Sequence, residues 1–290
     1  MHKNTETSHN LSEDEARSEL ARREWTDPAR VAQWASEWRQ HVRQSAAATS
    51  AMVGALSPRP GQRILDLATG TGDPALTLAR AVSPGGRVTC ADLSSGMLES
   101  ARAHAHDEGL DNLDFVVAGG ESLPFLAETF DAVSCRFGIM FMLDALAALR
   151  EMRRVLVPGG RVALMVWGRE DQPFFDDRRG TLLRHWKVIP PVRRPLAPWR
   201  FQEPDSLSSL LVEAGFGSVQ AQLLELRLPS GPPEPLLEAF RKQWRDEFAK
   251  MPASIAERIL AEVEARLASH TVGGEVFYTG EVWLVTGSRE

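Results

Sequence analysis

Residues 64–76 read ILDLATGTGDPAL, an apolar run that contains an aspartate and is followed by two closely spaced glycines and a second apolar run. Glycines placed after a strand let the chain turn sharply and let a ligand approach the backbone. The helix that follows then presents its N-terminus to the ligand. The stretch therefore predicts the first strand, the ligand-binding turn and the first helix of a parallel α/β sheet.

Downstream of this stretch, short apolar strands alternate with amphipathic helices. Nearly continuous apolar strands separated by helices are typical of a parallel sheet that is covered on both faces. Residues 61–168 are therefore predicted to form a doubly wound α/β core. The expected strands are residues 64–68, 87–93, 113–118, 130–137 and 160–167, and the expected helices are residues 74–82, 96–108 and 144–156.

The regions on either side of this core complete the expected domain organisation. Residues 1–20 are polar and are predicted to be a disordered arm. Residues 21–60 are predicted to be an N-terminal helical cap, because apolar side chains recur with a helical period over residues 30–56. Residues 169–204 are too long for a plain connection and are expected to form a lid insertion. Residues 205–290 should complete the fold, with a helical insertion between two closing strands.

Composition restricts the classes of partner. A net charge of −6 over 290 residues gives no general basic field for nucleic acid, so a small-molecule partner is expected. Cys90 and Cys135 are too few for a disulfide framework or a thiolate metal site, and both are expected to be buried free thiols. No metal site is predicted. With no secretion signal and no apolar run of the ~18 residues that a membrane helix needs, a cytoplasmic location without a membrane span is expected.

Three classes of ligand compete for the glycine-rich turn. A phosphate-binding P-loop would need a lysine after the second glycine, where Asp73 and Pro74 stand instead. A dinucleotide fingerprint accepts alanine at its third glycine position, so Ala75 excludes little. However, Asp73 places a carboxylate where a pyrophosphate would have to approach. A ligand with an amine and a sulfonium group, and without a phosphate, suits this turn better.

Two further aspartates belong to this region. Asp92 ends the second strand 20 residues beyond Gly72, where a carboxylate can accept hydrogen bonds from both hydroxyls of a ribose. The alternative is that Asp92 caps the helix that begins near Ser94, and ribose binding is favoured. Asp66 could hold the ammonium group of the ligand, directly or through water, or it could fix the turn by accepting backbone N–H bonds. These two interpretations of Asp66 stay open.

Five motifs follow one another in a recognisable order and spacing over residues 61–168. They are LDLATGTGD (65–73), ADLSSGML (91–98), GGESLPF (119–125), FDAVSCRFGIMFM (130–142) and REMRRVLVPGGRVAL (150–164). Together they closely resemble the motifs of class I S-adenosylmethionine (SAM)-dependent methyltransferases, and among these the ubiquinone/menaquinone-biosynthesis-like C-methyltransferases and their natural-product relatives. The resemblance implies SAM as the cofactor and a Rossmann-like sheet of seven strands, closed by an antiparallel hairpin of residues 219–228 and 281–289.

The resemblance also implies roles for individual residues. Asp92 would hold the ribose of SAM, and Arg136 would line the methionine end of the pocket. The other residues implied in cofactor binding are Asp66 and Ala68 at the turn, Gly70, Thr71 and Gly72 behind the methionine end, Leu93 and Met97 beside the adenine, and Gly119, Gly120 and Glu121 along its edge. One position departs from the family, because relatives usually carry Asp or Asn at 119 to accept from the adenine amino group. Glu121 or a water would then make that contact, or SAM would bind more weakly.

Methyl transfer from a sulfonium is an in-line displacement, so the main task is to hold acceptor, methyl and sulfur collinear in a dry pocket. A general base is optional. His185 in the lid and His41 in the cap are the candidate catalytic residues, although each is more often structural, and His104 is expected on the solvent side of its helix. The aromatic residues that could wall an apolar pocket are Trp34, Trp38, Trp167, Phe174, Phe175, Trp186 and Trp199.

The function expected from these observations is methyl transfer from SAM to a hydrophobic small molecule, either quinone-like or a secondary metabolite. C-methylation is slightly favoured over O-methylation. Two alternatives are a SAM-binding cyclase-type enzyme, in which the cap guides cyclisation, and a non-catalytic SAM-binding protein. The N-terminal helices could also pair two subunits as a homodimer.

Overall fold

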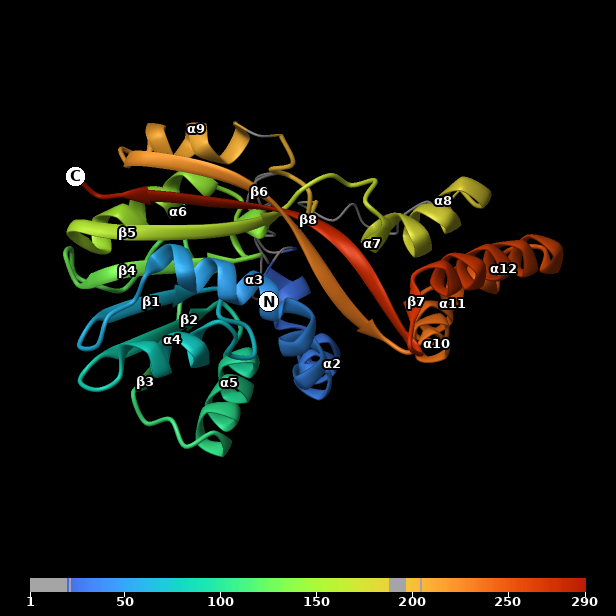
Figure 1. The fold of residues 1–290 in the computed structure, drawn as a ribbon, viewed down its shortest axis with the longest axis horizontal. Helices are drawn as coiled ribbons and strands as arrows, with labels where there is room; N and C mark the ends of the chain where they lie inside the picture. The colour runs from blue at the N-terminus through green and yellow to red at the C-terminus, as the bar shows by residue number, and fades with distance from the viewer. Residues whose placement is uncertain (1–19, 21, 188–196, 204) are drawn as a thin grey trace, which may run out of the picture.

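The computed structural model describes residue 20 and residues 22–187, 197–203 and 205–290 of the chain. Within these residues the strands form one sheet in the order β3-β2-β1-β4-β5-β8-β6, with β7 paired to β8 beside this path. The strands from β3 to β5 are parallel, and helices cover both faces of the sheet (Figure 1). The prediction of a doubly wound α/β sheet with seven main strands is confirmed. The predicted arm, residues 1–20, lies outside the described residues except for residue 20.

The bounds of the elements agree with the expected alternation over the core. The strands are β1 (Arg63–Leu67), β2 (Arg87–Asp92), β3 (Leu113–Val117), β4 (Phe130–Arg136), β5 (Leu156–Trp167), β6 (Gly217–Gly231), β7 (Thr271–Val272) and β8 (Glu275–Ser288). The helices are α2 (Pro28–Ser36), α3 (Trp38–Leu56), α4 (Ala75–Val82), α5 (Ser95–Asp107), η1 (Ile139–Phe141), α6 (Ala145–Val155), α7 (Pro173–Phe175), η2 (Asp176–Gly180), α8 (Thr181–His185), α9 (Ser206–Glu213), α10 (Pro233–Gln243), α11 (Arg245–Phe248) and α12 (Ala253–Ser269). No helix within the described ranges is both long and apolar enough to cross a membrane.

Successive side chains of the parallel strands point to opposite faces of the sheet and build a core on each face. Ile64 and Cys90 pack in a cluster with apolar side chains of α3, α4 and α5. Their neighbours Leu65 and Ala91 pack in a second cluster with side chains of α6 and α9. Cys90 and Cys135 lie in different clusters, and both are buried free thiols, as predicted. The helices on each face hold the strand ends in fixed positions, and the site lies at these ends.

The N-terminal cap contains two helices where one continuous helix was predicted over residues 30–56. Asp27 caps α2 by accepting the backbone N–H of Arg30, and Pro28 occupies the first turn of that helix. At Glu37 the backbone has φ −94° and ψ 7°, outside the helical range, and α3 begins directly afterwards. The turn at Glu37 lets α2 pack on α5 while α3 packs across β5 and β6.

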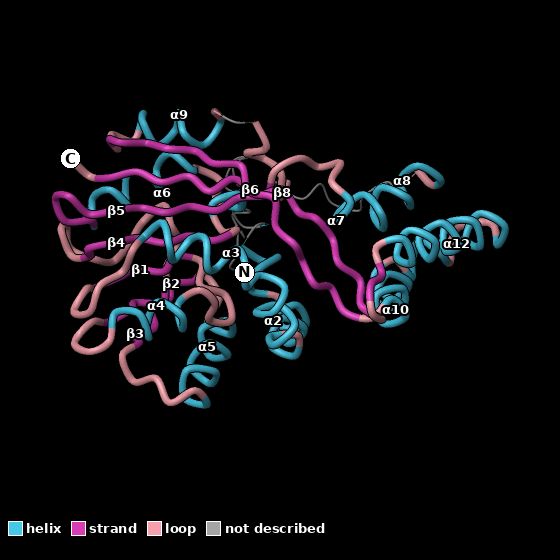
Figure 2. Tube along the Cα trace, viewed as in Figure 1, coloured by secondary structure: helices cyan, strands magenta, loops and turns pink. Residues whose placement is uncertain are grey.

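β6 and β8 are longer than the two strands predicted for this hairpin, which were residues 219–228 and 281–289. Residues 282–288 of β8 pair with β5, whereas residues 276–288 pair with β6. Beyond the sheet, β6 and β8 therefore continue as a two-stranded antiparallel ribbon, and α10, α11 and α12 lie at its far end (Figure 2). Tyr278, which is fully buried, belongs to the core cluster that runs along this ribbon.

The predicted lid, residues 169–204, lies beside this ribbon. Its helices α7, η2 and α8 pack on β8 and α12. Trp186 donates its indole N–H to Glu247 Oε2 of α11 at 3.0 Å, which joins the segment after α8 to the same helical group. Residues 188–196 and 204 lie outside the described part of the chain. The helices α7, η2 and α8 of the lid thus extend the helical group at the end of the ribbon (Figure 1), whereas Arg200 donates to the backbone oxygen of Met142 at 2.6 Å and Phe201 packs in the core.

Candidate active site

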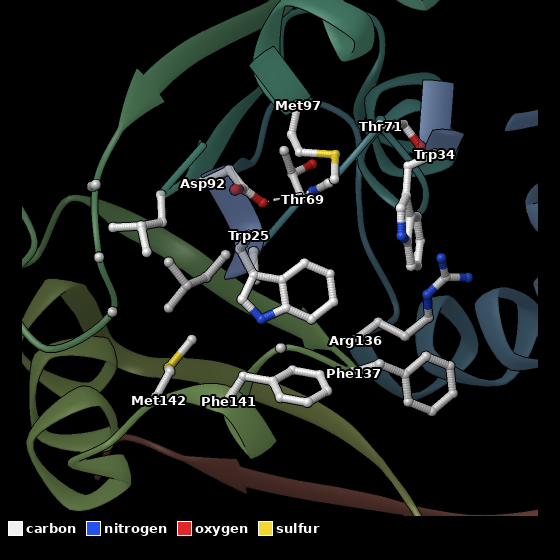
Figure 3. A pocket seen from close by; sticks show the side chains of 18 of the residues that line it. Trp25, Trp34, Thr69, Thr71, Asp92, Met97, Arg136, Phe137, Phe141 and Met142 are labelled. Atoms are coloured by element: carbon white, nitrogen blue, oxygen red, sulfur yellow. Dashed lines mark hydrogen bonds between the residues drawn. The ribbon is translucent and has the colours of Figure 1, made fainter. Parts of the chain in front are cut away.

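A pocket of about 450 Å³ lies where β1, β2 and β4 end, beneath the N-terminal cap. Figure 3 shows Asp92 and Met142 on one side of the pocket, Arg136 and Phe137 on the other, and the ring of Trp25 between them. The walls are formed by Arg22, Trp25, Trp34, Trp38, His41 and Val42 from the N-terminal region, Leu67–Thr71 and Asp73 from the first turn, Asp92, Leu93 and Met97 after β2, Ala118–Glu121 after β3, and Arg136–Gly138 and Phe141–Asp144 after β4. Ligands of doubly wound sheets bind at this edge.

The glycine-rich turn has a backbone that only small residues adopt easily. Gly70 has φ +54° and Gly72 has φ +116°, in the left-handed region that favours glycine. A Cβ atom on Gly72 would lie 2.6 Å from Leu76 Cδ1, so this position also requires close packing between the turn and α4. Ala68 enters the turn with φ +57°. Gly72 itself is not part of the pocket wall, whereas Ala68, Gly70 and Thr71 are.

Asp92 lies at the end of β2 with its carboxylate in the pocket wall. It is 8% exposed. Its Oδ2 accepts the backbone N–H of Gly70 at 2.9 Å, and its Oδ1 accepts the backbone N–H of Ser94 at 2.9 Å. Ser94, rather than Asp92, caps α5 through its own hydroxyl. Each carboxylate oxygen of Asp92 uses one lone pair in these bonds and keeps another for a ligand.

Asp66 lies beneath the turn and is fully buried. Its oxygens accept hydrogen bonds from the hydroxyls of Ser134, at 2.5 Å, and Thr69, at 2.7 Å. Burial raises the pKa of Asp66 to about 6, although these two bonds oppose the rise. Asp66 does not belong to the pocket wall. The structure therefore supports the interpretation that Asp66 fixes the turn, through side-chain hydroxyls instead of the expected backbone N–H groups.

Asp73 does not present an isolated carboxylate to the ligand. The argument that its negative charge would repel a pyrophosphate is therefore weaker than the sequence suggested. Arg136 Nη1 lies 2.6 Å from Asp73 Oδ2, and Arg136 Nη2 donates to the backbone oxygen of Asp73 at 2.8 Å. Ser45 and Thr49 of α3 also donate to Asp73 Oδ2, at 3.1 and 2.8 Å. Both side chains of the ion pair are about nine-tenths buried. This cluster joins the cap, the turn and the end of β4.

The residues expected beside the adenine all line the same part of the pocket. Glu121 Oε1 accepts the backbone N–H of Leu143 at 3.1 Å. Glu121 Oε2 lies 3.5 Å from the point that a Cβ atom on Gly119 would occupy. A carboxylate oxygen thus stands next to the position where relatives carry Asp or Asn. The adenine-side residues in the wall are Leu93, Met97, Gly119, Gly120 and Glu121.

The structure separates the two candidate catalytic histidines. His41 lies in the pocket wall, with its ring 4.4 Å from that of Trp34. His185 is not in the wall; its Nε2 lies 2.7 Å from Glu262 Oε2 of α12. The assignment of His185 is therefore corrected, because the part of the lid that carries His185 packs on the helices of the ribbon and not over the pocket. His41 is the candidate that the geometry retains.

Most of the aromatic residues proposed for the pocket wall have a packing role instead. Trp167 stacks between Phe137 and Phe174, with ring centroids 4.5 and 5.0 Å away. Phe175 contacts Trp199 at 5.8 Å. Of these five side chains, only Phe137 lines the pocket. Among the aromatic residues singled out from the sequence, the wall contains Trp34 and Trp38, so the expectation is corrected for Trp167, Phe174, Phe175, Trp186 and Trp199.

Sequence reasoning gave no role, or a wrong one, to several residues in and behind the pocket wall. Trp25 precedes the helical pattern of the cap, but it reaches the pocket and its ring lies 5.0 Å from Phe141. Phe141 and Met142 end the motif FGIMFM, which was recognised without assigning these side chains a role. His104 was expected in solvent, but its Nδ1 lies 2.9 Å from the backbone oxygen of Thr71. Its spacing of seven residues from Met97, two helical turns, is the signal that could have placed it on the inner face of α5.

Comparisons with known proteins agree with the fold and identify the family. Residues 38–192 match the model of the ubiE/COQ5 methyltransferase family. The chain is 43% identical over 116 residues to the ubiquinone/menaquinone biosynthesis C-methyltransferase UbiE of Hahella chejuensis, an alignment that covers 40% of this chain and 47% of that protein. It is 32% identical over 174 residues to the UbiE protein of Shewanella sp. (strain W3-18-1), covering 56% of this chain and 68% of that protein. The chain thus spans about half to two thirds of these relatives.

A solved structure supports the fold over nearly the whole chain. Phosphoethanolamine N-methyltransferase 2 of Haemonchus contortus, in complex with S-adenosyl-L-methionine, superposes with a TM-score of 0.58 and 18% identity, covering 97% of this chain and 60% of that chain. At this identity the likeness shows the fold alone. The family match covers more than half of the chain and includes every motif on which the resemblance rested. The chain belongs to the ubiE/COQ5 methyltransferase family of SAM-dependent enzymes.

Proposed function

We propose that this enzyme transfers the methyl group of SAM to a hydrophobic small molecule, and that it favours carbon over oxygen as the methylated atom. The family match supports a quinone-like acceptor, and a secondary metabolite with a similar aromatic ring is the alternative acceptor. The observation that carries the proposal is the position of Asp92. A buried carboxylate at the end of β2 lies in the wall of the pocket beside the glycine-rich turn.

In this proposal SAM extends along the edge of the sheet. Asp92 would accept hydrogen bonds from the ribose hydroxyls, in addition to the backbone N–H groups of Gly70 and Ser94 that its two oxygens accept. Leu93 and Met97 would flank the adenine, and Glu121 would take the place of the missing side chain at 119. Ala68, Gly70 and Thr71 lie along the methionine part of SAM, with Gly72 and Asp66 supporting the turn from behind. Arg136 marks the end of the pocket at which the sulfonium would meet the acceptor.

The walls of the pocket suit the transfer step. Aromatic faces of the cap and of the segment after β4 exclude water and favour the positive sulfonium. The methyl group is attacked in line with the departing sulfur, so the enzyme gains rate chiefly by holding acceptor and sulfonium in that geometry. The side chains that supply these faces are Trp25, Trp34, Trp38, Phe137 and Phe141.

The cofactor assignment is tested by calorimetric titration with SAM, S-adenosylhomocysteine (SAH) and NAD. Asp92→Asn keeps the volume of the side chain but loses one charged acceptor, so SAM affinity should fall roughly 10- to 100-fold, as expected for a hydrogen bond to a charged group. Asp107→Asn is the matched control, because Asp107 ends α5 with its side chain 77% exposed. Equal SAM affinity in the Asp92 variant and the control would refute the ribose assignment, and NAD binding would refute the choice of cofactor.

Release of SAH separates methyl transfer from the two alternative functions. The wild-type protein, incubated with SAM and a panel of hydrophobic quinols and phenols, should form SAH and a methylated product of equal amount. Conversion of an acceptor without SAH would support the cyclase-type enzyme. Micromolar SAM binding without turnover on any acceptor would support the non-catalytic SAM-binding protein. Mass spectrometry and NMR of the product then distinguish C- from O-methylation.

We also propose a cytoplasmic location and a homodimer that forms through the N-terminal helices. The dimer is supported by α2, which has no buried residue within the single chain. Sedimentation tests the dimer by comparing the mass of the full chain with that of a variant carrying charged substitutions on the outer face of α2. Equal masses of the two proteins would refute a dimer through these helices. Cell fractionation tests the location.

A further inference from the structure

Thr49 lies inside α3 and directs its hydroxyl group out of its own helix. Hydroxyl side chains within a helix commonly donate to the carbonyl oxygen four residues earlier. Ser45, one turn before Thr49, lies 2.6 Å from the backbone oxygen of His41 in this way and also 3.1 Å from Asp73 Oδ2. The Thr49 hydroxyl donates to Asp73 Oδ2 at 2.8 Å. Thr49 thus connects the cap directly to the glycine-rich turn.

The same hydroxyl accepts a hydrogen bond from Arg136 at the end of β4. Arg136 Nη1 lies 2.6 Å from Thr49 Oγ1 and 2.6 Å from Asp73 Oδ2. A hydroxyl has one hydrogen and two lone pairs, so Thr49 donates to the anion while it accepts from the cation. Thr49 is 5% exposed and does not line the pocket, whereas Asp73 and Arg136 do. Thr49 therefore lies behind the pocket wall and contacts both charges that belong to it.

The ion pair depends on such additional bonds. The attraction within a buried ion pair offsets the loss of hydration only when further hydrogen bonds satisfy the remaining lone pairs and protons. Arg136 Nη2 donates to the backbone oxygen of Asp73 at 2.8 Å, and Thr49 bonds to both side chains from a different element. The hydroxyl of Thr49 thus restricts where the two opposite charges stand in the wall.

We propose that Thr49 is a positioning residue for the amino-acid part of SAM, which it serves by holding Asp73 and Arg136 in one geometry. This inference rests on the proposed function and extends it to a residue behind the pocket wall. The amino-acid part of SAM carries an ammonium and a carboxylate group at pH 7, and the ion pair supplies a charge of opposite sign for each. Charges that are fixed before the ligand arrives lose little freedom on binding, so preorganisation increases the affinity.

The role of Thr49 is confined to one end of the cofactor. Figure 3 shows Arg136 on the opposite side of the pocket from Asp92, the residue to which the ribose is assigned. Thr49 contacts the ion pair, while Asp92 is held by the backbone N–H groups of Gly70 and Ser94. Loss of the Thr49 hydroxyl should therefore weaken the binding of the amino-acid part and leave the binding of the adenosine part unchanged.

Two ligands separate these parts in calorimetric titrations. SAH contains both, whereas 5′-deoxy-5′-methylthioadenosine (MTA) keeps the adenosine and the thioether but has a methyl group in place of the amino-acid arm. Thr49→Val keeps the shape of the side chain and removes the hydroxyl. SAH affinity should fall about tenfold in this variant, the size of effect expected for hydrogen bonds to charged groups, and MTA affinity should stay within twofold. Thr49→Ser retains the hydroxyl and should keep both affinities within twofold of the wild type.

Thr181→Val is the matched control because Thr181 has a similar environment outside the pocket. Thr181 is fully buried at the start of α8. Its Oγ1 accepts from Arg184 Nη2 at 2.8 Å and donates to the backbone oxygen of Asp177 at 2.9 Å. Removal of either buried hydroxyl should lower Tm. The ratio of SAH to MTA affinity should change in Thr49→Val and remain that of the wild type in Thr181→Val, a difference that a merely structural role would not produce.

Several results would overturn the role of Thr49. They are an unchanged SAH affinity in Thr49→Val, equal losses of SAH and MTA affinity in that variant, the same change of ratio in Thr181→Val, and a Thr49→Ser variant that behaves like Thr49→Val. Thr49→Ala carries the same expectation if Thr49→Val does not fold. Wild-type protein that binds SAH and MTA equally well would overturn the role of Thr49 and leave the cofactor assignment intact. Wild-type protein that binds neither ligand would overturn the proposed function itself, which distinguishes the two failures.

Discussion

The indole ring of Trp38 lies stacked on the imidazole ring of His104, with centroids 4.2 Å apart and 12° between the planes. Trp38 begins α3 of the cap, and His104 lies on α5 of the core. The same imidazole places Nδ1 2.9 Å from the backbone oxygen of Thr71. The imidazole ring of His104 thereby gives the cap a second connection to the glycine-rich turn, in addition to the bonds of Ser45 and Thr49 to Asp73.

Trp38→Ala should therefore loosen the cap and shorten the residence of the cofactor. Removal of the stack costs about 0.5–1.5 kcal/mol beyond the lost area, and the expected result is SAH release that is several-fold faster in stopped-flow fluorescence. Trp186→Ala is the matched control, since Trp186 contacts Glu247 of α11 outside the pocket. Equal release rates in both variants would show that the stack does not retain the ligand.

Gly119→Asn should tighten SAM binding roughly 2- to 10-fold, the effect of one added neutral hydrogen bond. The Cβ atom of the new residue would lie 3.5 Å from Glu121 Oε2 and 3.8 Å from Leu93 Cδ1, which are ordinary contacts, and the amide oxygen could accept from the adenine amino group. Gly120→Ala should act in the opposite direction, because its Cβ atom would lie 2.6 Å from Met142 Sδ. Calorimetry of both variants checks this; weaker binding in Gly119→Asn would place the adenine elsewhere.

Asp66 should make the stability of the enzyme depend on pH in a way that Asp66→Asn does not. Burial raises its pKa from an ordinary 3.8 to about 6, so its ionised form is disfavoured in the folded state. Its contribution is favourable at low pH and declines by roughly 3 kcal/mol as pH rises from about 3.8 to about 6. Urea unfolding of the wild type and of Asp66→Asn at several pH values measures the difference in their free energies of unfolding. The contributions of all other titrating groups cancel in this difference. Parallel curves would contradict a raised pKa.

Glu262 should give the opposite dependence at the helical end of the ribbon. Hydrogen bonds from His185, Arg184 and Arg266 lower the pKa of Glu262 from 4.5 to about 2. Its stabilising contribution is thus present above about pH 4.5 and is lost as pH falls toward 2. Glu262→Gln should expose α8 to hydrogen exchange at pH 7 but differ little from the wild type near pH 2. Glu264→Gln, an exposed neighbour on α12, should behave like the wild type throughout.

The core of the fold could be predicted because its signals are local. Each parallel strand is a short apolar run ended by a turn, and the glycine-rich turn is specific through the backbone that Gly70 and Gly72 adopt. The ends of β1, β2 and β4 follow from the same pattern, so the pocket position and the placement of Asp92 in its wall could be expected. Asp92 was also distinguished correctly from the cap residue of α5, which is Ser94.

The remaining errors share a physical cause, which is dependence on contacts between distant segments. His185 was assigned to the pocket because its lid segment is aromatic, but its place is set by Glu262, 77 residues further along the chain. The charge of Asp73 seemed free because Arg136, its partner, lies 63 residues away. Trp25 was overlooked because it precedes the periodic pattern of the cap. None of these long-range contacts can be inferred from the local periodicity of the sequence.

The two-stranded ribbon has a consequence for folding and for change during evolution. One half of β6 and of β8 lies in the sheet, and the other half of each strand packs with the helical group. The hydrogen-bonded pairing between the two strands is continuous through both halves. Because side chains alternate along a strand, a slip of one residue would turn the inward side chains of the sheet and of the helical group outward together. One register therefore fixes two hydrophobic interiors, and an insertion in β6 would be tolerated only where its pairing with β8 is irregular, between Gly217 and Gln220 or between Pro229 and Gly231.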